Sequence, residues 1–122
     1  MKETYTKPEY RELSPEERRL FEWLIANGNA EASGYDSQVS QLKVVARCTC
    51  GCPTLDVALG EKKSRTVGAS TILANAVGRS PEGVPVDVIL HAREGEISEL
   101  EVVSHDATKI FSMPEPEMLQ IV

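Results

Sequence analysis

The stretch from Val84 to His91 reads Val-Pro-Val-Asp-Val-Ile-Leu-His and gives the plainest secondary-structure signal in the chain. Its apolar side chains recur at every second position, at Val84, Val86, Val88 and Leu90. A period of two is typical of a β-strand that buries one face. The residues that follow, Arg93-Glu94-Gly95-Glu96, have the composition of a hairpin turn. We therefore expect a strand here, with an antiparallel neighbour after the turn.

Alternating segments continue on both sides of this strand. Residues 97–104 predict the neighbour, and a shift in their alternation between Ile97 and Leu100 indicates a β-bulge. Upstream, a further strand is predicted by Ile72, Ala74 and Ala76, with Arg79–Gly83 as its turn.

An earlier pair of strands surrounds the sequence Gly51-Cys52-Pro53. From Leu42 to Cys50 the period is two, with Val44, Ala46, Cys48 and Cys50 on one side. Alternation resumes at Leu55, Val57 and Leu59 after the turn residues. This pattern predicts a β-hairpin whose turn carries the cysteines.

Two helices are expected before the first of these strands. Ser14-Pro15-Glu16-Glu17 has the form of a capping box with proline at the first helical position, and it predicts a helix over about 15–27. Its apolar face is formed by Leu20, Phe21, Leu24 and Ile25. A second helix is predicted over about 30–41, although Gly34 and three serines lower its helical propensity.

The expected fold is therefore a single α+β domain spanning residues 1–122. Two N-terminal helices would pack on an antiparallel meander sheet of four to five strands. Residues 1–13 are expected to form an N-terminal arm. Residues 113–122, which contain Pro114 and Pro116, are expected to form a C-terminal tail rather than a strand.

Composition narrows the functional classes. The chain has 122 residues, 19 acidic against 13 basic, and a formal net charge of −6. Such a balance argues against nucleic-acid binding, which favours a basic face. The sequence contains no apolar run of membrane-spanning length and no apolar segment typical of a secretory signal at its start. We expect a cytoplasmic protein that binds neither nucleic acid nor membrane.

The one unusual constellation is the cysteine cluster in Arg47-Cys48-Thr49-Cys50-Gly51-Cys52-Pro53-Thr54-Leu55-Asp56, which contains all three cysteines of the chain. Cys48, Cys50 and Cys52 have four possible roles. They can pack as small apolar side chains, because Cys48 and Cys50 are predicted to lie on the same side of the strand as Val44. They can also act as redox or nucleophilic thiols, or form a disulfide.

The fourth role is a metal site made by Cys48, Cys50 and Cys52. Thiolates suit zinc and copper(I), and a fourth position would remain for His91, His105 or solvent. Against it, structural zinc sites use Cys-x₂₋₄-Cys pairs, and ligands two residues apart on a strand lie roughly 6.5 Å apart. The sequence leaves these four roles open.

The run Cys-x-Cys-Gly-Cys-Pro-Thr-Leu-Asp, together with Gly95-Glu96-Ile97-Ser98-Glu99-Leu100-Glu101-Val102, resembles a family of small uncharacterised bacterial proteins. That family carries a Cys-x-Cys-Gly-Cys-Pro-[Ser/Thr]-[Ile/Leu]-Asp hairpin motif. The resemblance implies a bacterial source and a shared fold. It implies no catalytic role for any residue.

A second polar group falls on neighbouring predicted strands. Asp87, His91, Glu99 and Glu101 can share one sheet face, where carboxylates and a histidine could serve acid–base chemistry or hold a cation. This face is opposite to the one that carries Val84, Val86, Val88 and Leu90, so we expect it to be solvated.

No catalytic constellation stands out, so we expect a non-enzymatic module that binds another protein or itself. A sheet face or an edge strand would be its contact surface. The alternative is a small metal-binding protein that uses Cys48, Cys50 and Cys52, with zinc as the first candidate. A cysteine-dependent enzyme is the third possibility.

Overall fold

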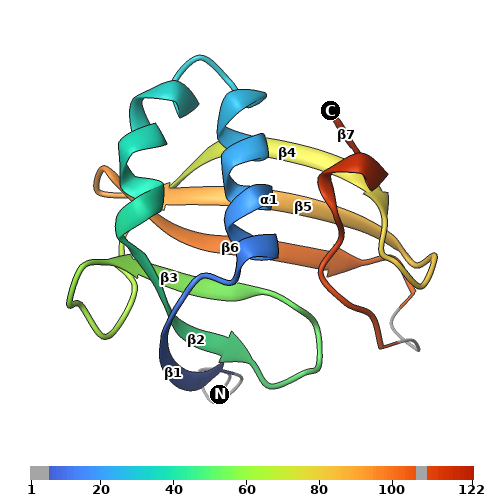
Figure 1. The fold of residues 1–122 in the computed structure, drawn as a ribbon, viewed down its shortest axis with the longest axis horizontal. Coiled ribbons are helices and arrows are strands. Elements are labelled where there is room, and N and C mark those ends of the chain that lie inside the picture. Colours follow the sequence, from blue (N-terminus) through green and yellow to red (C-terminus); the bar gives the residue numbers. More distant parts are fainter. Residues whose placement is uncertain (1–5, 107–109) are drawn as a thin grey trace.

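The computed structural model describes residues 6–106 and 110–122 and shows one antiparallel sheet with two helices over one of its faces (Figure 1). The strands lie in the order β1-β2-β3-β6-β5-β4-β7. In chain order the elements are β1 (Thr6–Glu12), α1 (Pro15–Ala26), the 3₁₀ helix η2 (Ala32–Gln41), β2 (Leu42–Cys48), β3 (Leu55–Leu59), β4 (Ser70–Arg79), β5 (Pro85–Arg93), β6 (Glu96–Ser104), the 3₁₀ turn η3 (Pro116–Met118) and β7 (Leu119–Ile121).

The hydrophobic core lies between α1, η2 and the inner face of the sheet. Its members share complete or nearly complete burial and include Leu20, Phe21, Leu24, Val44, Val57, Val88, Leu90 and Leu100. The four apolar residues predicted for the first helix are all buried. The alternation that predicted the strand at 84–91 is also confirmed, since Val86, Val88 and Leu90 point into this core.

The start of α1 is held by the predicted capping box. The Ser14 hydroxyl accepts a hydrogen bond from the backbone N–H of Glu17, and the Glu17 carboxylate accepts one from the backbone N–H of Ser14. The same carboxylate accepts two hydrogen bonds from the Arg11 guanidinium, each 2.9 Å long. Arg11 therefore ties β1 to the first turn of the helix.

The predicted fold class is wrong in its strand count. The sheet has seven strands rather than four or five, because segments expected to be an arm and a tail are strands at its two edges. Residues 6–12 of the predicted arm 1–13 form β1, which pairs with β2, while residues 1–5 lie outside the described residues. Part of the predicted tail 113–122 forms β7, which pairs with β4.

Both missed strands lack the signal that marks a half-buried strand. β1 carries Pro8 and mostly charged side chains, a composition that an edge strand tolerates. β7 has three residues, which is too short for a period of two to show. Its partner strand presents Gly78, where any Cβ would overlap the carbonyl oxygen of Met118. The close approach of β7 thus depends on that glycine.

The predicted meander holds for β4, β5 and β6, and the predicted bulge is confirmed. His91 pairs with Glu99 and Ala92 pairs with Ile97, so Ser98 is the extra residue of β6. β3 does not pair with β4, its successor in the chain; it pairs with β6 at Leu55 and Asp56. The sheet therefore consists of two three-stranded groups joined by β3 and β6, with β7 added at one edge.

The second predicted helix forms with a tighter geometry than expected. Residues 32–41 are a 3₁₀ helix, in which Ala32 and Val39 are buried. The low helical propensity of Gly34 and the serines is consistent with this weaker form. Among the described residues, no helix has both the length and the apolar character needed to span a membrane.

Candidate metal centre

A bulge in β2 decides where the first cysteine points. The pairing of β2 with β3 shifts between Val44 and Ala46, so Val45 is an extra residue. Side chains beyond a bulge change face. Val44 therefore lies in the core opposite Val57, whereas Ala46 and Cys48 lie on the outer face, away from the helices. The prediction that Val44 and Cys48 lie on the same face of the strand is wrong for this reason.

The three thiols come together in the loop that follows β2. The strand ends at Cys48, and Gly51 adopts a φ of +99°, a backbone conformation that favours glycine. The Sγ atoms of Cys48 and Cys50 lie 2.7 Å apart, and those of Cys50 and Cys52 lie 3.0 Å apart. All three Sγ atoms lie within 4.8 Å of one another. The separation expected for ligands along one strand does not apply, because the chain turns.

Backbone donors support this arrangement of sulfurs. The backbone N–H of Cys50 donates to Sγ of Cys48, and the backbone N–H of Cys52 donates to Sγ of Cys50, each over 3.4 Å. The Cys52 thiol donates to Oγ1 of Thr54 over 3.4 Å. N–H groups directed at sulfur favour the thiolate form, which is the form that binds metals.

The thiols differ in how readily they ionise. Burial, together with its thiol contacts to Cys50 and Cys52, raises the pKa of Cys48 to about 12. Burial also opposes ionisation of Cys50, but hydrogen bonds from the two neighbouring thiols and from backbone N–H groups outweigh it and lower the pKa of Cys50. Cys50 is also the exposed member of the cluster. As the pH rises, Cys50 therefore becomes a thiolate before Cys48 does.

A cavity of about 520 Å³ opens beside the cluster. The three cysteines and Thr54 line one side of it, and Glu99 and Glu101 from β6 line another. An apolar wall is formed by Val102, Val103, Ile110 and Phe111. A volume in this range suits a small molecule. The cluster is thus placed at the edge of a pocket with both acidic and apolar walls.

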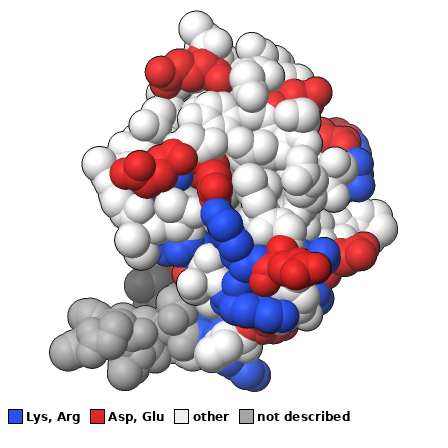
Figure 2. Space-filling model, turned by 90° about the vertical axis from the view of Figure 1, so that its left-hand side faces the viewer, with Lys and Arg blue, Asp and Glu red and all other residues white. Residues whose placement is uncertain are grey.

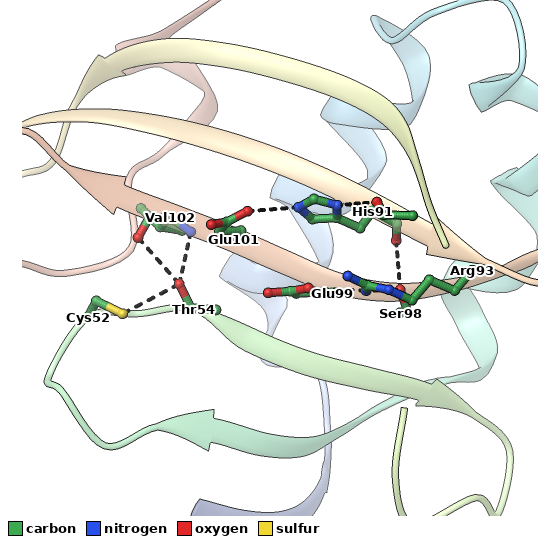
Figure 3. A network of polar contacts seen from close by, with 9 residues as sticks. Cys52, Thr54, His91, Arg93, Ser98, Glu99, Glu101 and Val102 are labelled. Atoms are coloured by element: carbon green, nitrogen blue, oxygen red, sulfur yellow. Dashed lines mark hydrogen bonds and ion pairs between the residues drawn. The ribbon is translucent and has the colours of Figure 1, made fainter. Parts of the chain in front are cut away.

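The acidic wall belongs to a chain of polar contacts on the outer face (Figure 3). Nε2 of His91 donates to Oε1 of Glu101 over 2.8 Å, and its Nδ1 lies 2.5 Å from the Ser70 hydroxyl. On the other side, Thr54 accepts from the backbone N–H of Val102 over 2.9 Å. Thr54 thereby links the cysteine loop to the strand that carries Glu101.

Arg93 holds the second carboxylate of this wall. Its guanidinium donates to Glu99 over 3.1 Å and to the buried hydroxyl of Ser98 over 2.9 Å. The side chains of His91 and Arg93 are only 11% and 13% exposed. The expectation that this face is solvated is therefore wrong around His91 and Glu99, although the predicted sharing of one face by Asp87, His91, Glu99 and Glu101 is confirmed by the strand pairing.

Neither histidine joins the cysteine cluster. His91 is engaged by Glu101 and Ser70, and Nε2 of His105 lies 3.2 Å from the carboxylate of Asp87. Among the described residues, the group of cysteine, histidine and acidic side chains that could hold one metal ion consists of Cys48, Cys50 and Cys52. Three protein ligands are thus gathered in one place, close enough to bind a metal ion.

The loop of residues 60–69, which joins β3 to β4, carries several charged side chains. On the side shown in Figure 2, basic side chains are interleaved with acidic ones rather than forming a continuous basic patch. In and around this loop, Lys62 forms an ion pair with Glu96 at 2.7 Å, and Arg65 forms one with Asp56 at 3.5 Å. The Nζ atom of Lys63 lies 3.6 Å from the centroid of the Tyr10 ring.

Comparison with known proteins gives no match to a protein-family model, to a curated protein or to a solved structure. The resemblance to a bacterial family with a Cys-x-Cys-Gly-Cys-Pro hairpin therefore stays a prediction. Function has to be argued from the site itself.

Sequence reasoning identified the three cysteines but not the pocket beside them. The sequence pattern groups Glu99 and Glu101 with His91, and nothing in it places them beside the Cys48–Cys52 loop. That proximity comes from the pairing of β3 with β6, a contact between segments far apart in the chain. Thr54, which connects the two parts, carries no sequence signal of its role.

Proposed function

We propose that this protein binds a soft metal ion, with zinc as the first candidate, through the thiolates of Cys48, Cys50 and Cys52. The observation that carries the proposal is the convergence of the three Sγ atoms to within 4.8 Å. The alternative role as core packing loses support from the geometry. Cys50 is exposed and Cys48 lies on the outer face, so these two cysteines do not pack as core residues.

The donor set is consistent with a thiophilic ion. Thiolates prefer zinc and copper(I) over the hard ions calcium and magnesium, which take oxygen ligands. Metal binding displaces the thiol protons, and the cation offsets the repulsion among the three thiolates that result. Zinc adopts four ligands in a tetrahedral arrangement, so a fourth ligand would come from outside the cluster.

The test is metal content together with affinity. Untagged protein is analysed by mass spectrometry for zinc and copper, and apo-protein is then titrated with zinc against a chromogenic competitor. We expect one equivalent of zinc per chain. The variant with all three cysteines changed to serine should bind none, because it retains no thiol.

Matched controls separate the cluster from the rest of the chain. His105→Asn and Glu61→Gln change exposed side chains outside the cluster and should leave the stoichiometry at one equivalent. Wild-type protein that stays metal-free in the zinc titration, with three thiols free to react, would reject the proposal. So would equal metal binding by wild type and the triple serine variant.

A second candidate function is self-association through the outer face of the sheet. Ile72, Val77 and Val103 are 48%, 40% and 38% exposed on that face. The first two lie on β4 and the third on β6, the strands on either side of β5, and exposed apolar side chains on one face favour a protein contact. Light scattering during size-exclusion chromatography tests this: a dimer that Val77→Glu converts to a monomer supports it, and a wild-type monomer at high concentration removes it.

A further inference from the structure

We infer that the metal ion of the cysteine cluster keeps one coordination position open to the neighbouring cavity, and that a small aminothiol completes the coordination there. This inference rests on the metal binding proposed above and names the ligand class of the same site. The aminothiol would bind the metal through its sulfur and place its ammonium group at the acidic wall of the cavity.

The open position follows from the count of donors. Three thiols are gathered, and the described cysteine, histidine and acidic residues add no fourth donor to the group. The two histidines are engaged elsewhere, with Glu101 and Ser70 or with Asp87. A four-coordinate ion held by three protein ligands takes its fourth from solvent or from a ligand.

The position of the cavity gives that fourth ligand its direction. Cys48, Cys50 and Cys52 all line the cavity of about 520 Å³, so an ion bound to their sulfurs lies at its wall. The cavity is large enough for a small molecule in addition to water. A ligand bound to the open position would therefore extend between the acidic and apolar walls.

The walls define the chemistry of the ligand. Glu99 and Glu101 carry carboxylates, and Arg93 forms an ion pair with Glu99. The Glu101 side chain is 37% exposed and keeps its carboxylate accessible from the cavity. Val103, Ile110 and Phe111 offer contact to a hydrocarbon segment. A sulfur donor for the thiophilic ion, a short apolar segment and a cationic group together describe an aminothiol.

An anionic ligand fits less well. With a divalent ion bound to three thiolates, and with Arg93 beside Glu99, the cavity wall still carries more negative than positive charge, because Glu99 and Glu101 add two carboxylates. A carboxylate or phosphate ligand would meet that excess of negative charge. A ligand with an ammonium group reduces this repulsion. The cationic end is therefore the specificity element of the proposal, and Glu101 is the residue that we expect to recognise it.

The experiment uses cobalt(II) in place of zinc, because its visible absorption reports the ligands of the ion. Apo-protein is loaded with one equivalent of cobalt(II) and titrated with cysteamine or with 2-mercaptoethanol, which has a hydroxyl in place of the ammonium group. We expect saturable changes in the d–d bands with both thiols while cobalt stays bound.

Glu101 is tested through the ratio of the two affinities. The two thiols differ in acidity, so the measurement is the change of the cysteamine-to-mercaptoethanol affinity ratio between variants. We expect Glu101→Gln to lower this ratio by about two- to fivefold, as for loss of one partly exposed charged contact. Glu61→Gln, which removes an exposed carboxylate outside the cavity, should leave the ratio unchanged.

The outcomes separate this inference from the proposed function. If cobalt(II) does not bind, the metal site itself is rejected. If it binds and millimolar thiol leaves the spectrum unchanged, or strips the metal from the protein, the open position is rejected and the metal site stands. An unchanged affinity ratio in Glu101→Gln, in protein whose circular dichroism matches wild type, rejects the aminothiol.

Discussion

Two residues of the cysteine loop show how the backbone controls thiol chemistry. Gly51 permits the left-handed turn that brings Cys50 and Cys52 to the same side of the loop. The extra residue Val45 has the complementary effect, because it turns Cys48 out of the core. The cluster therefore depends on the backbone conformation at Val45 and Gly51 as well as on the three cysteines.

The first prediction concerns alkylation of the metal-free protein. Its lowered pKa gives Cys50 more thiolate at neutral pH than Cys48, whose pKa is raised to about 12. Because the thiolate is the nucleophile, iodoacetamide should modify Cys50 faster than Cys48, and the Cys50 rate should level off at lower pH. Peptide mass spectrometry of timed samples at pH 6 to 9 measures both rates.

The control for this prediction is Cys50→Ser, which should lose the fast reaction while Cys48 stays slow. Bound zinc should slow modification of all three thiols. Equal rates at Cys48 and Cys50 across this pH range would contradict the assigned order of ionisation.

At the scale of elements, the edges of the sheet are secured by contacts to strands and helices that the sequence pattern does not reveal. β1 is tied to α1 by Arg11 and Glu17, and β7 is accommodated by Gly78 of β4. Arg19 of α1 also pairs with Glu117 of η3. Each edge thus depends on a small number of identifiable residues.

The second prediction tests the joint between β1 and α1. Glu17 is half-buried, and burial opposes ionisation of its carboxyl group. Hydrogen bonds from Arg11 and Ser14 outweigh this effect and lower the pKa of the carboxyl. A lowered folded-state pKa gives stability that is present above the ordinary carboxyl pKa and lost as pH falls through the folded value. Glu17→Gln should cost about 0.5–1 kcal/mol at pH 7, after allowance for solvent screening, and less at pH 3.

Urea unfolding of wild type and Glu17→Gln at both pH values measures this difference. Glu16→Gln is the matched control, because Glu16 is exposed in the same helical turn and stands outside the capping box. A Glu17→Gln penalty that stays constant from pH 7 to pH 3 would contradict the ionic part of the argument.

The third prediction concerns the last strand of the sheet. Gly78→Ala would drive a methyl group into the backbone of Met118 and Leu119, so β7 should separate from β4. We expect a loss of about 1–3 kcal/mol, typical of overpacking. Hydrogen exchange should rise at the β7 amides and leave α1 protected.

Gly34→Ala is the control for that variant. A Cβ at Gly34 meets nothing within 4 Å, and the position has no left-handed φ, so its stability should be unchanged or slightly higher. Intact exchange protection of β7 in Gly78→Ala would show that the strand can shift to accommodate the methyl group.

At the scale of the whole molecule, local pattern predicted the central elements and failed where long-range pairing decides. The capping box predicted α1, and alternation predicted β5 and the bulge of β6, because each signal is set by neighbours in the chain. The edge strands and the β3–β6 contact depend on segments far apart in sequence. The three cysteines could be named from sequence as candidate metal ligands, whereas the convergence of their sulfurs and the cavity beside them required the structure.

The fourth prediction follows from the coupling of the site to this fold. An ion that binds the native cluster more tightly than the unfolded chain stabilises the protein, by about 2.7 kcal/mol at a free concentration one hundred times Kd. Zinc should therefore raise the urea midpoint of the wild type and leave the triple serine variant unchanged. A zinc-dependent shift of the same size in both proteins would place the effect outside the cluster.

The strand order has a consequence for protein synthesis. Strands β2 and β3 with their cysteine loop leave the ribosome well before β6, which carries Glu99 and Glu101. The thiols are therefore complete as a set of ligands while the cavity still lacks one wall, and closing it requires the long-range contact between β3 and β6. Contacts between distant segments form slowly. If the cluster binds a metal as proposed, an ion that meets the nascent chain would occupy the sulfurs first, and the pocket would be assembled around an ion already in place.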